Sequence, residues 1–333
     1  MRELLSFQPL FKERIWGGRA IEAVLGRAIP TGMPIGESWD VVDRPEAQSV
    51  VAGGSLAGLT LRTVLERDGA RIMGPGWRPS DPFPILVKWL DCRERLSLQV
   101  HPPADVAKRL HGEPKTENWY VAHAAQGAQL MVGLKPGTSR AQFEAAFAGN
   151  TLEGCVRHFS AAAGDSILVP AGQIHAIGAG NLILEIQLNS DTTYRVHDWG
   201  RAGLDGRPRK LHVAETIESI AWDNFEPELV RAAPESGVIA KCDGFLIRRV
   251  MLDSGGRLTI AAGEQPRLLS VVSGSVTASA IQRDDAKGES AGRVFELGSN
   301  VLIPHSGGFR FVADSPAIVL VTEDFAGLGA PRA

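Results

Sequence analysis

The sequence has little cysteine, no long apolar run and no long run of like charge. Its three cysteines, Cys92, Cys155 and Cys242, stand singly, which excludes a disulfide framework and a Cys-x-x-Cys zinc site and suits a reducing compartment. No stretch of about 18 apolar residues occurs, and charged residues stand where the apolar core of a signal peptide would lie. We therefore expect a cytoplasmic protein without a membrane span.

The balance of charge argues against nucleic acid and membrane partners. The 35 basic and 38 acidic residues give a formal net charge of -3, with no basic cluster to attract either partner. With 333 residues, 44% of them hydrophobic, the chain can form one large domain or two to three modest ones. A small-molecule function is the better expectation, carried out by a monomer or a homodimer.

Short apolar runs interrupted by glycine and proline predict a mainly β protein. The runs expected to form strands are 83–90, 96–101, 166–170, 181–188, 245–252, 267–279, 300–304 and 317–323. Helical periodicity is confined to 55–69, 104–112, 138–149 and 210–220. We expect these helices to lie at the periphery of a sheet framework.

A weak internal repeat indicates two related β units. The segments GDSILVPAGQIHAIG and GSNVLIPHSGGFRFV align without gaps, so that Gly164 and Gly298 each precede a proline by the same spacing. Glycine allows the turn into a strand, the apolar run fills the core, and proline ends the strand. The residue that then points back into the barrel is His175 in the first copy and Phe309 in the second.

The spacing G-x5-P-x-G-x2-H, which ends at His175, resembles the second conserved motif of the cupin superfamily. The resemblance implies two cupin-type jelly-roll barrels with a few peripheral helices. We predict a metal-binding catalytic cupin domain at 1–235 and a degenerate, metal-free cupin-like β-domain at 236–333, where Phe309 replaces the histidine. Taken alone, the motif fits equally well an ordinary hairpin with a structural histidine.

The segment SLQVHPPADVAKRLHGEPKTENWYV supplies the ligands that the motif lacks. Gln99 and His101 are two residues apart on a predicted strand and so face the same side, and Glu117 could join them from a neighbouring strand. With His175 they offer two imidazole nitrogens, one carboxylate oxygen and one amide oxygen. This set suits zinc or another borderline divalent ion better than magnesium or calcium. We predict one divalent metal per chain, Zn²⁺ being the best fit.

Several motifs together resemble those of the type I phosphomannose isomerases, in the short bacterial form that lacks a large helical insertion. They are LSLQVHP, KTE, VPAGQIHAIGAGNLILEIQ and TTYRVHDWGR, with PLFKERIWGG and GESWDVVD nearer the N-terminus. The resemblance is densest over 83–201. It implies a zinc-dependent aldose-ketose isomerase that interconverts mannose 6-phosphate and fructose 6-phosphate through an enediol. It also implies that the metal ligands are Gln99, His101, Glu117 and His175.

The same resemblance implies the residues around the substrate. Lys115, Glu185 and Arg195 would be catalytic, and Lys88 and Ser97 would bind the sugar phosphate. The base is Lys115, its pKa lowered by the metal and by burial, or else Glu185; the residues leave this choice open. Arg195 suits sugar or phosphate oxygens because its guanidinium is planar and permanently charged. For Lys88 the alternative to substrate binding is a lysine that extends into solvent from a barrel rim. For Ser97 it is a serine whose hydroxyl bonds its own backbone.

Two other functions account for part of the pattern. An iron cupin oxygenase would use two histidines and a carboxylate, but an apolar substrate requires neither Gln99 as a ligand nor Lys115 and Arg195. A sugar-binding cupin that had lost catalysis would keep every ligand. For Arg195 itself, the alternative is a surface ion pair with Asp191 or Asp198.

Overall fold

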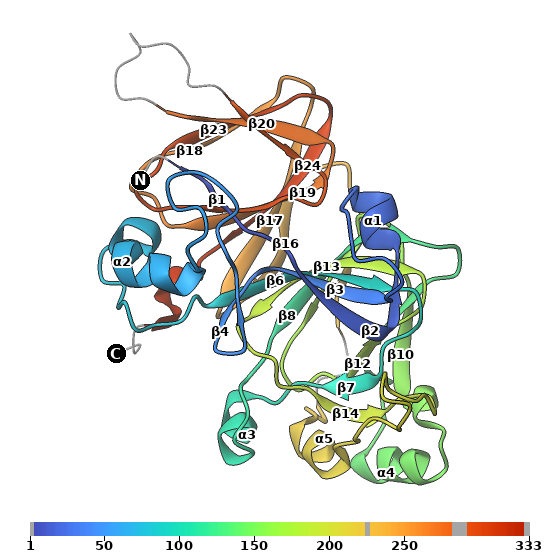
Figure 1. Cartoon of the computed structure of the whole chain (residues 1–333). Coiled ribbons are helices and arrows are strands. Elements are labelled where there is room, and N and C mark those ends of the chain that lie inside the picture. The colour runs from blue at the N-terminus through green and yellow to red at the C-terminus, as the bar shows by residue number, and fades with distance from the viewer. Residues whose placement is uncertain (1–2, 224–226, 282–291, 330–333) are drawn as a thin grey trace. The chain divides into compact units, whose positions relative to one another are not determined.

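The computed structural model describes residues 3–223, 227–281 and 292–329 (Figure 1). The chain divides into two compact units. The site unit comprises Phe11–Trp39 and Lys88–Ala232, and the C-terminal unit comprises Met1–Leu10, Asp40–Val87 and Ala233–Ala333. The chain passes from the site unit to the C-terminal unit for the last time after Ala232, close to the boundary predicted at residue 235. Residues 40–87 also belong to the C-terminal unit, which no sequence pattern indicated. The functional division into a catalytic and a degenerate domain stays a prediction.

Two antiparallel sheets form the framework of the site unit. A seven-stranded sheet has the order β15-β11-β8-β13-β6-β3-β2, and a five-stranded sheet has the order β10-β9-β12-β7-β14. The strands are β2 (Leu10–Gly18), β3 (Ile35–Val41), β6 (Ile85–Cys92), β7 (Leu98–Val100), β8 (Glu117–Ala124), β9 (Gln129–Leu134), β10 (Val156–Ser160), β11 (Ser166–Val169), β12 (His175–Ile177), β13 (Asn181–Leu188), β14 (Tyr194–His197) and β15 (Leu229–Val230). Buried side chains from both sheets, such as Trp119, Ile167 and Val132, share one core. The two sheets therefore form a barrel filled by side chains.

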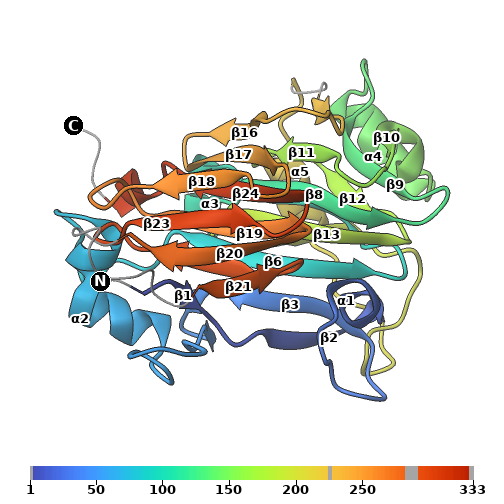
Figure 2. The ribbon, with the colours of Figure 1, turned by 90° about the horizontal axis from the view of Figure 1, so that it is seen from above.

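The C-terminal unit has the same plan. Its six-stranded sheet has the order β1-β22-β19-β24-β17-β16, and its four-stranded sheet, whose strands lie side by side in Figure 2, has the order β18-β23-β20-β21. The strands, with the small hairpin of β4 and β5, are β1 (Leu5–Ser6), β4 (Asp43–Arg44), β5 (Ala47–Gln48), β16 (Gly237–Cys242), β17 (Phe245–Leu252), β18 (Arg257–Ile260), β19 (Arg267–Ser273), β20 (Ser275–Ala280), β21 (Arg293–Glu296), β22 (Asn300–Ile303), β23 (Phe309–Ala313) and β24 (Ala317–Glu323). Phe309, at 2% exposure, packs in its core with Val271 and Val319. The prediction that this barrel binds no metal stays a prediction.

The predicted repeat is reproduced in backbone geometry. Gly164 and Gly298 have φ angles of 90° and 91°, in the region that favours glycine. His175 is the first residue of β12, and Phe309 is the first residue of β23. The two segments therefore build equivalent hairpins, one carrying an imidazole and the other a core phenyl ring.

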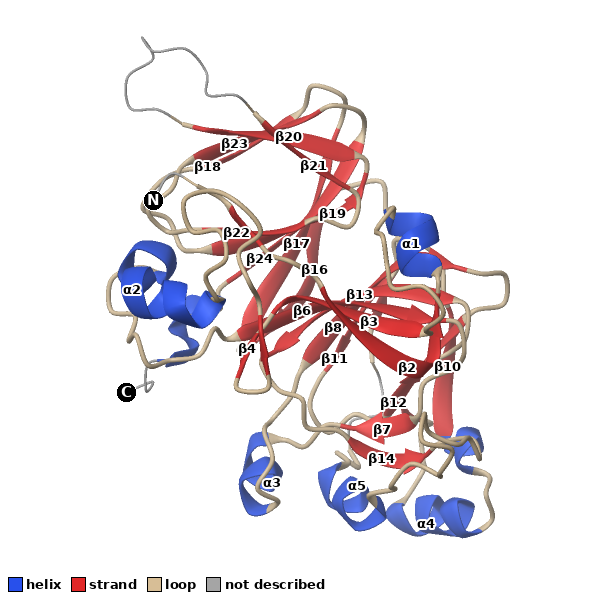
Figure 3. Cartoon of the chain, in the orientation of Figure 1, coloured by secondary structure: helices blue, strands red, loops and turns tan. Residues whose placement is uncertain are grey.

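Helices lie outside the strands of the site unit, as α3, α4 and α5 show in Figure 3. The helices are α1 (Ala20–Leu25), α2 (Leu61–Met73), α3 (Ala104–Arg109), α4 (Arg140–Ala148) and α5 (Val213–Ser219), with 3-10 turns η1 (Leu152–Cys155) and η2 (Ala326–Gly329). Of the five α-helices in the described ranges, four lie within or overlap the predicted segments. In the described part of the chain, no helix is both long and apolar enough to cross a membrane.

Candidate active site

Three neighbouring strands of the five-stranded sheet bring predicted site residues into one row. In the order β12-β7-β14, His175 pairs with Gln99, and Gln99 pairs with Arg195. Directly paired residues of an antiparallel sheet present their side chains on the same face. His101 follows β7 by one residue. The predicted strand alternation therefore places these residues together.

Glu117 reaches the group from a different direction than expected. It begins β8, which belongs to the seven-stranded sheet and is not a neighbour of β7. The expectation of a neighbouring strand is thus wrong. Strand adjacency is set by topology, which short sequence motifs do not encode.

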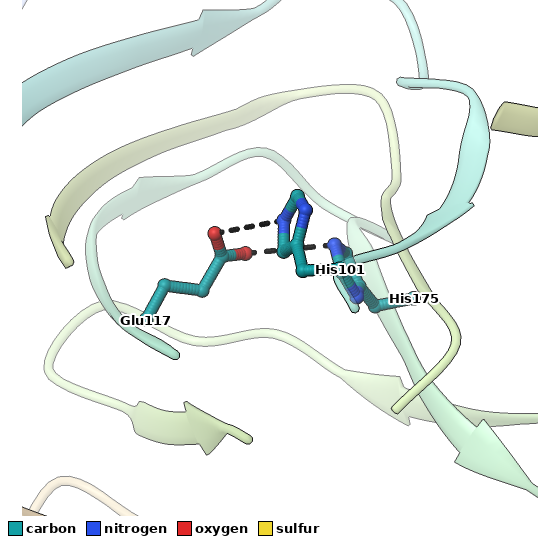
Figure 4. Close-up of side chains that lie close together, drawn as sticks. All are labelled: His101, Glu117 and His175. Carbon is teal, nitrogen blue, oxygen red and sulfur yellow. Dashed lines mark ion pairs between the residues drawn. The ribbon is translucent and has the colours of Figure 1, made fainter. Parts of the chain in front are cut away.

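His101, Glu117 and His175 form a compact buried group (Figure 4). The Nε2 atom of His101 lies 3.1 Å from Oε2 of Glu117, and Nε2 of His175 lies 3.6 Å from Oε1. The side chains are 1% exposed. Each imidazole thus faces one oxygen of the same carboxylate.

Hydrogen bonds fix which nitrogen of each imidazole faces inward. Nδ1 of His101 lies 2.9 Å from the carbonyl oxygen of Thr192, and Nδ1 of His175 lies 2.8 Å from that of Gln173. Because a carbonyl oxygen only accepts, Nδ1 donates in both cases. Burial, with the charge of Lys115 adding to it, lowers the pKa of His101 to about 3, and burial also lowers the pKa of His175. Both rings are therefore neutral and turn an Nε2 lone pair toward Glu117.

This arrangement fits a bound cation. Among the described residues, Nε2 of His101 and Oε1 of Glu117 are buried without a hydrogen bond, while Oε2 of Glu117 has the ammonium group of Lys115 2.9 Å away. Lone pairs of neutral imidazoles facing a carboxylate in a buried space are unfavourable unless a cation lies between them. Metal-bound histidines also commonly donate their second N–H to a backbone carbonyl, as both do here. The three residues could therefore bind a metal.

Gln99 lies next to this group. Its Nε2 is 3.3 Å from Nε2 of His175, and its Oε1 accepts a hydrogen bond from Ser97 Oγ at 3.2 Å. The two ends of an amide are assigned from hydrogen bonds, and a half-turn would bring the oxygen to the site. A role for Gln99 as the fourth ligand stays a prediction.

Two lysines and Glu185 extend the site beyond Glu117. Nζ of Lys115 lies 2.9 Å from Oε2 of Glu117 and 3.6 Å from Oε1 of Glu185. Nζ of Lys88 lies 2.8 Å from the same Oε1, and Trp119 Nε1 donates to Oε2 of Glu185 at 3.1 Å. Burial and the charge of Glu117 raise the pKa of Glu185, against the lowering effect of both lysines. Lys88 is 6% exposed and so does not extend from a rim.

A cavity of about 600 Å³ in the site unit collects the predicted substrate and catalytic residues. Its lining includes Lys88, Ser97, Gln99, Lys115, Glu185 and Arg195. Because Gln99 contacts His175 and Lys115 contacts Glu117, the His/Glu/His group lies directly behind this lining. The cavity therefore joins a space of small-molecule size to the predicted metal site.

Arg195 does not form the surface ion pair that was its alternative. Its Nε donates to Ser97 Oγ at 3.1 Å, and its Nη1 donates to the carbonyl oxygen of Lys210 at 3.2 Å. Asp198 instead pairs with Arg201 at 2.8 Å and with Arg209 at 2.5 Å. Within the described ranges, Arg195 makes no ion pair and thus keeps an unneutralised charge beside the cavity. Ser97 Oγ likewise bonds side chains and not its own backbone.

The sequence alone did not indicate several residues of the cavity lining, notably Arg14, Glu37, Arg209 and His212. Nε of Arg14 lies 2.8 Å from Oε1 of Glu37, and Trp39 Nε1 donates to Oε2 of Glu37 at 2.5 Å. The available signal was the alternation of a carboxylate and a tryptophan in GESWD, which predicts that both face one side of a strand.

Replacing Glu37 by glutamine is expected to destabilise the fold by about 3 kcal/mol at pH 7. Burial acts to raise the pKa of Glu37, but the charges of Lys88 and Arg14 outweigh it and lower the pKa to about 2. Since the folded pKa lies below the unfolded value, this stability is complete above pH 4.5 and is lost as the pH falls toward 2. Urea unfolding of wild type and variant should therefore show a difference that shrinks in acid. A difference that stayed constant from neutral pH into acid, or an equal loss in the less buried control Glu13→Gln, would contradict this assignment.

The paired sheets and the buried His/Glu/His group define a protein of cupin fold that could hold a metal. Residues 4–127 match the family described as phosphomannose isomerase type I, catalytic domain. The chain is 39% identical over 220 residues to the mannose-6-phosphate isomerase ManA of Bacillus subtilis (strain 168), covering 66% of this chain and 68% of that protein. It is 37% identical over 219 residues to the mannose-6-phosphate isomerase of Streptococcus mutans serotype c, covering 66% and 68%.

The fold agrees with these relatives. The crystal structure of the mannose 6-phosphate isomerase from Bacillus subtilis superposes with a TM-score of 0.80 at 28% identity, covering 97% of this chain and 100% of that one. The chain belongs to the type I phosphomannose isomerase family. The resemblance seen in the sequence, and the mainly β cupin fold it implied, are confirmed.

Proposed function

We infer that the chain is a mannose-6-phosphate isomerase, which interconverts mannose 6-phosphate and fructose 6-phosphate through an enediolate. Besides family membership, the observation that carries this function is the cavity in which Lys115, Glu185 and Arg195 surround the approach to the His/Glu/His group. The substrate is a sugar phosphate. The cytoplasmic location and the monomeric or homodimeric state stay predictions.

We propose that the group holds one Zn²⁺ through His101, Glu117 and His175, with the amide oxygen of Gln99 as a fourth ligand. The neutral imidazoles, fixed at Nδ1 by backbone carbonyls, and the carboxylate between them support this assignment. Mixed nitrogen and oxygen donors suit zinc. When bound, the metal supplies Lewis-acid stabilisation of the charge that develops on sugar oxygens.

The proton that moves between adjacent sugar carbons needs an acceptor and a donor at the cavity wall. We propose that Lys115 and Glu185 serve as one pair, because their charged atoms lie 3.6 Å apart and both line the cavity. Glu185 lies between the ammonium groups of Lys115 and Lys88, so a replacement of Lys115 also changes the surroundings of Glu185. The remaining choice of base therefore concerns the pair and not two independent residues.

The phosphate is expected to bind near Arg195. Lys88, predicted to bind the substrate, already forms an ion pair with Glu185, with 2.8 Å between Nζ and Oε1. Its effect on the substrate would therefore be exerted partly through Glu185. Arg195 and Arg209 line the cavity, and Asp198 is shared between Arg209 and Arg201. Of these groups, the guanidinium of Arg195 makes no ion pair in the described residues, so it can bond a phosphate dianion without first losing a carboxylate partner. Ser97 Oγ, bonded to Arg195 Nε, lies at the same place.

A coupled assay that follows fructose 6-phosphate formed from mannose 6-phosphate tests the function. We expect turnover that a chelator abolishes and that added Zn²⁺ restores, because the two neutral imidazoles and Glu117 Oε1 point at one another and Lys115 contacts only Oε2 of the carboxylate. Run in deuterium oxide with Lys115→Met and Glu185→Gln, the same assay measures isotope entry into the sugar and so tests the pair. Binding of sugar phosphate without turnover would favour a sugar-binding cupin, and chelator-resistant turnover would contradict the metal assignment.

A further inference from the structure

The two imidazoles of the His/Glu/His group are held in different ways. His175 lies in β12, and its Nδ1 donates to a carbonyl only two residues away, that of Gln173 at 2.8 Å. His101 lies beyond the end of β7, and its Nδ1 donates at 2.9 Å to the carbonyl of Thr192, 91 residues away. Thr192 belongs to the β13–β14 connection, residues 189–193. The orientation of His101 therefore depends on a segment remote in sequence.

Side chains and not a strand ladder hold this connection. Nε2 of Gln187 donates to the carbonyl oxygens of Leu188 at 2.8 Å and Ser190 at 2.6 Å. Ser190 Oγ accepts from the backbone N–H of Thr192 at 3.2 Å and donates to the carbonyl of Glu113 at 3.3 Å. Thr192 Oγ1 accepts from the backbone N–H of Glu113 at 3.0 Å. The chain of bonds from Gln187 thus ends at the residue whose carbonyl fixes His101.

Gln187 is itself part of the barrel interior. It is 0% exposed and pairs directly with Glu117 across β13 and β8, so the two side chains lie on the same face. Its amide is turned toward the chain that leaves the strand, where it donates to the carbonyl oxygens of Leu188 and Ser190. Because both hydrogen bonds donated by this buried amide lie at the start of the β13–β14 connection, they fix the path of the connection.

We propose that Gln187 is a positioning residue of the metal site. It holds the β13–β14 connection so that the carbonyl of Thr192 keeps the proton on Nδ1 of His101 and aims Nε2 at the carboxylate of Glu117. This inference rests on the proposed metal site. Partners behind a ligand of this kind set both its tautomer and its orientation, and their loss typically weakens metal binding about 10- to 100-fold.

The test uses Gln187→Met, which keeps an unbranched side chain of similar length and removes both donors. Competition with a chelator on the zinc-loaded enzyme should show a metal dissociation constant raised about 10- to 100-fold. In the same protein, labelled with ¹⁵N-histidine, the Nδ1–H signal of His101 should broaden or vanish through exchange. The signal of His175, whose acceptor is local, should persist.

The matched control is Asn181→Leu, at the other end of the same strand. Asn181 is 2% exposed, and its Nδ2 donates to the carbonyls of Gly178 at 2.9 Å and Gln129 at 3.2 Å. Neither carbonyl holds an imidazole. This variant should lower the melting temperature but leave the metal dissociation constant and both histidine signals as in wild type.

A second variant, Ser190→Ala, removes the hydroxyl that accepts from the N–H of Thr192 and so breaks the chain of hydrogen bonds from Gln187. It tests the proposal if Gln187→Met does not fold. It should weaken metal binding in the same direction. Unchanged affinity and an unchanged His101 signal in the folded variants would overturn the proposal, as would an equal loss of affinity in Asn181→Leu. If wild type bound no metal, the proposed function would fail, while the His101 signal would still decide the role of Gln187.

Discussion

Replacement of His101 or His175 by alanine is expected to remove the metal and the turnover together. Each imidazole presents a neutral Nε2 to Glu117, and the three groups meet within 4.8 Å. Of the four proposed ligands, three would remain with Gln99 included, but only one of them would be an imidazole, so the ion would be held much more weakly. Turnover should fall about 1000-fold or more, since Lewis-acid stabilisation contributes several kcal/mol and each 1.4 kcal/mol is tenfold. Elemental analysis and the coupled assay measure both effects.

His123→Ala is the matched control. His123 is exposed and lies on β8, the strand that begins with Glu117. It should keep wild-type metal content and activity. Full metal stoichiometry and full activity in His175→Ala would show that the ligand set is wrong, and retained metal without activity would assign His175 a role in the reaction and not in binding.

The strands were predictable where both faces of a strand are buried. For β13 and β24 the apolar runs give the observed bounds, because a strand covered on both sides reads as a continuous apolar stretch between turn residues. The bounds of β17 were also predicted, although Arg248 and Met251 of that strand are exposed. The short helix α1 was missed, since it depends on a distant partner. The N–H groups of Ala20 and Ile21 donate to Asp91 at 2.5 and 3.2 Å. Local periodicity carries no signal of such a cap.

α2 shows a different limit. The predicted segment began at residue 55, but the helix begins after Thr60, whose side chain accepts from the N–H of Thr63. Because Thr60 and Thr63 both lie near the start of the apolar pattern, the sequence did not show which of them caps the helix. By contrast, Ser139 and Gln142 form a capping box and Gly149 ends α4, so the predicted bounds of that helix were close.

The site was predictable to the extent that its residues are close in sequence or belong to a recognisable motif. Alternation from β7 and the glycine-proline spacing before His175 placed His101 and His175 of the His/Glu/His group together, while their role as metal ligands stays a prediction. The charge pair of Arg14 and Glu37 was not predictable, because it joins strands 23 residues apart whose pairing is a property of the whole sheet. The dependence of His101 on Thr192 has the same origin, a contact between segments that no local pattern links.

Arg195→Ala is expected to lower the catalytic rate constant about 100- to 1000-fold, the usual effect of removing one preorganised charged donor. Within the described residues, its guanidinium has no carboxylate partner, and the cavity lies beside it. Burial and the charges of Arg209, Arg201 and Arg14 lower the pKa of Arg195, against the raising effect of the Asp198 carboxylate. The guanidinium of Arg195 is therefore stabilised strongly when a negative charge enters the cavity. Arg195→Lys should rescue little, since a lysine cannot bond Ser97 and an anion with one planar fork.

Metal content and melting temperature, measured alongside kinetics, separate this role from a structural one. The control is Arg231→Ala, whose guanidinium pairs with Asp165 at 2.7 Å in the same unit but does not line the cavity. It should lower the melting temperature more than Arg195→Ala does and leave turnover close to wild type, because the buried carboxylate of Asp165 loses the guanidinium group and keeps only backbone N–H donors. If both Arg195 variants turned over near the wild-type rate, the positive charge of Arg195 would have no part in the reaction. Lys115 would then be the main cation that stabilises the enediolate.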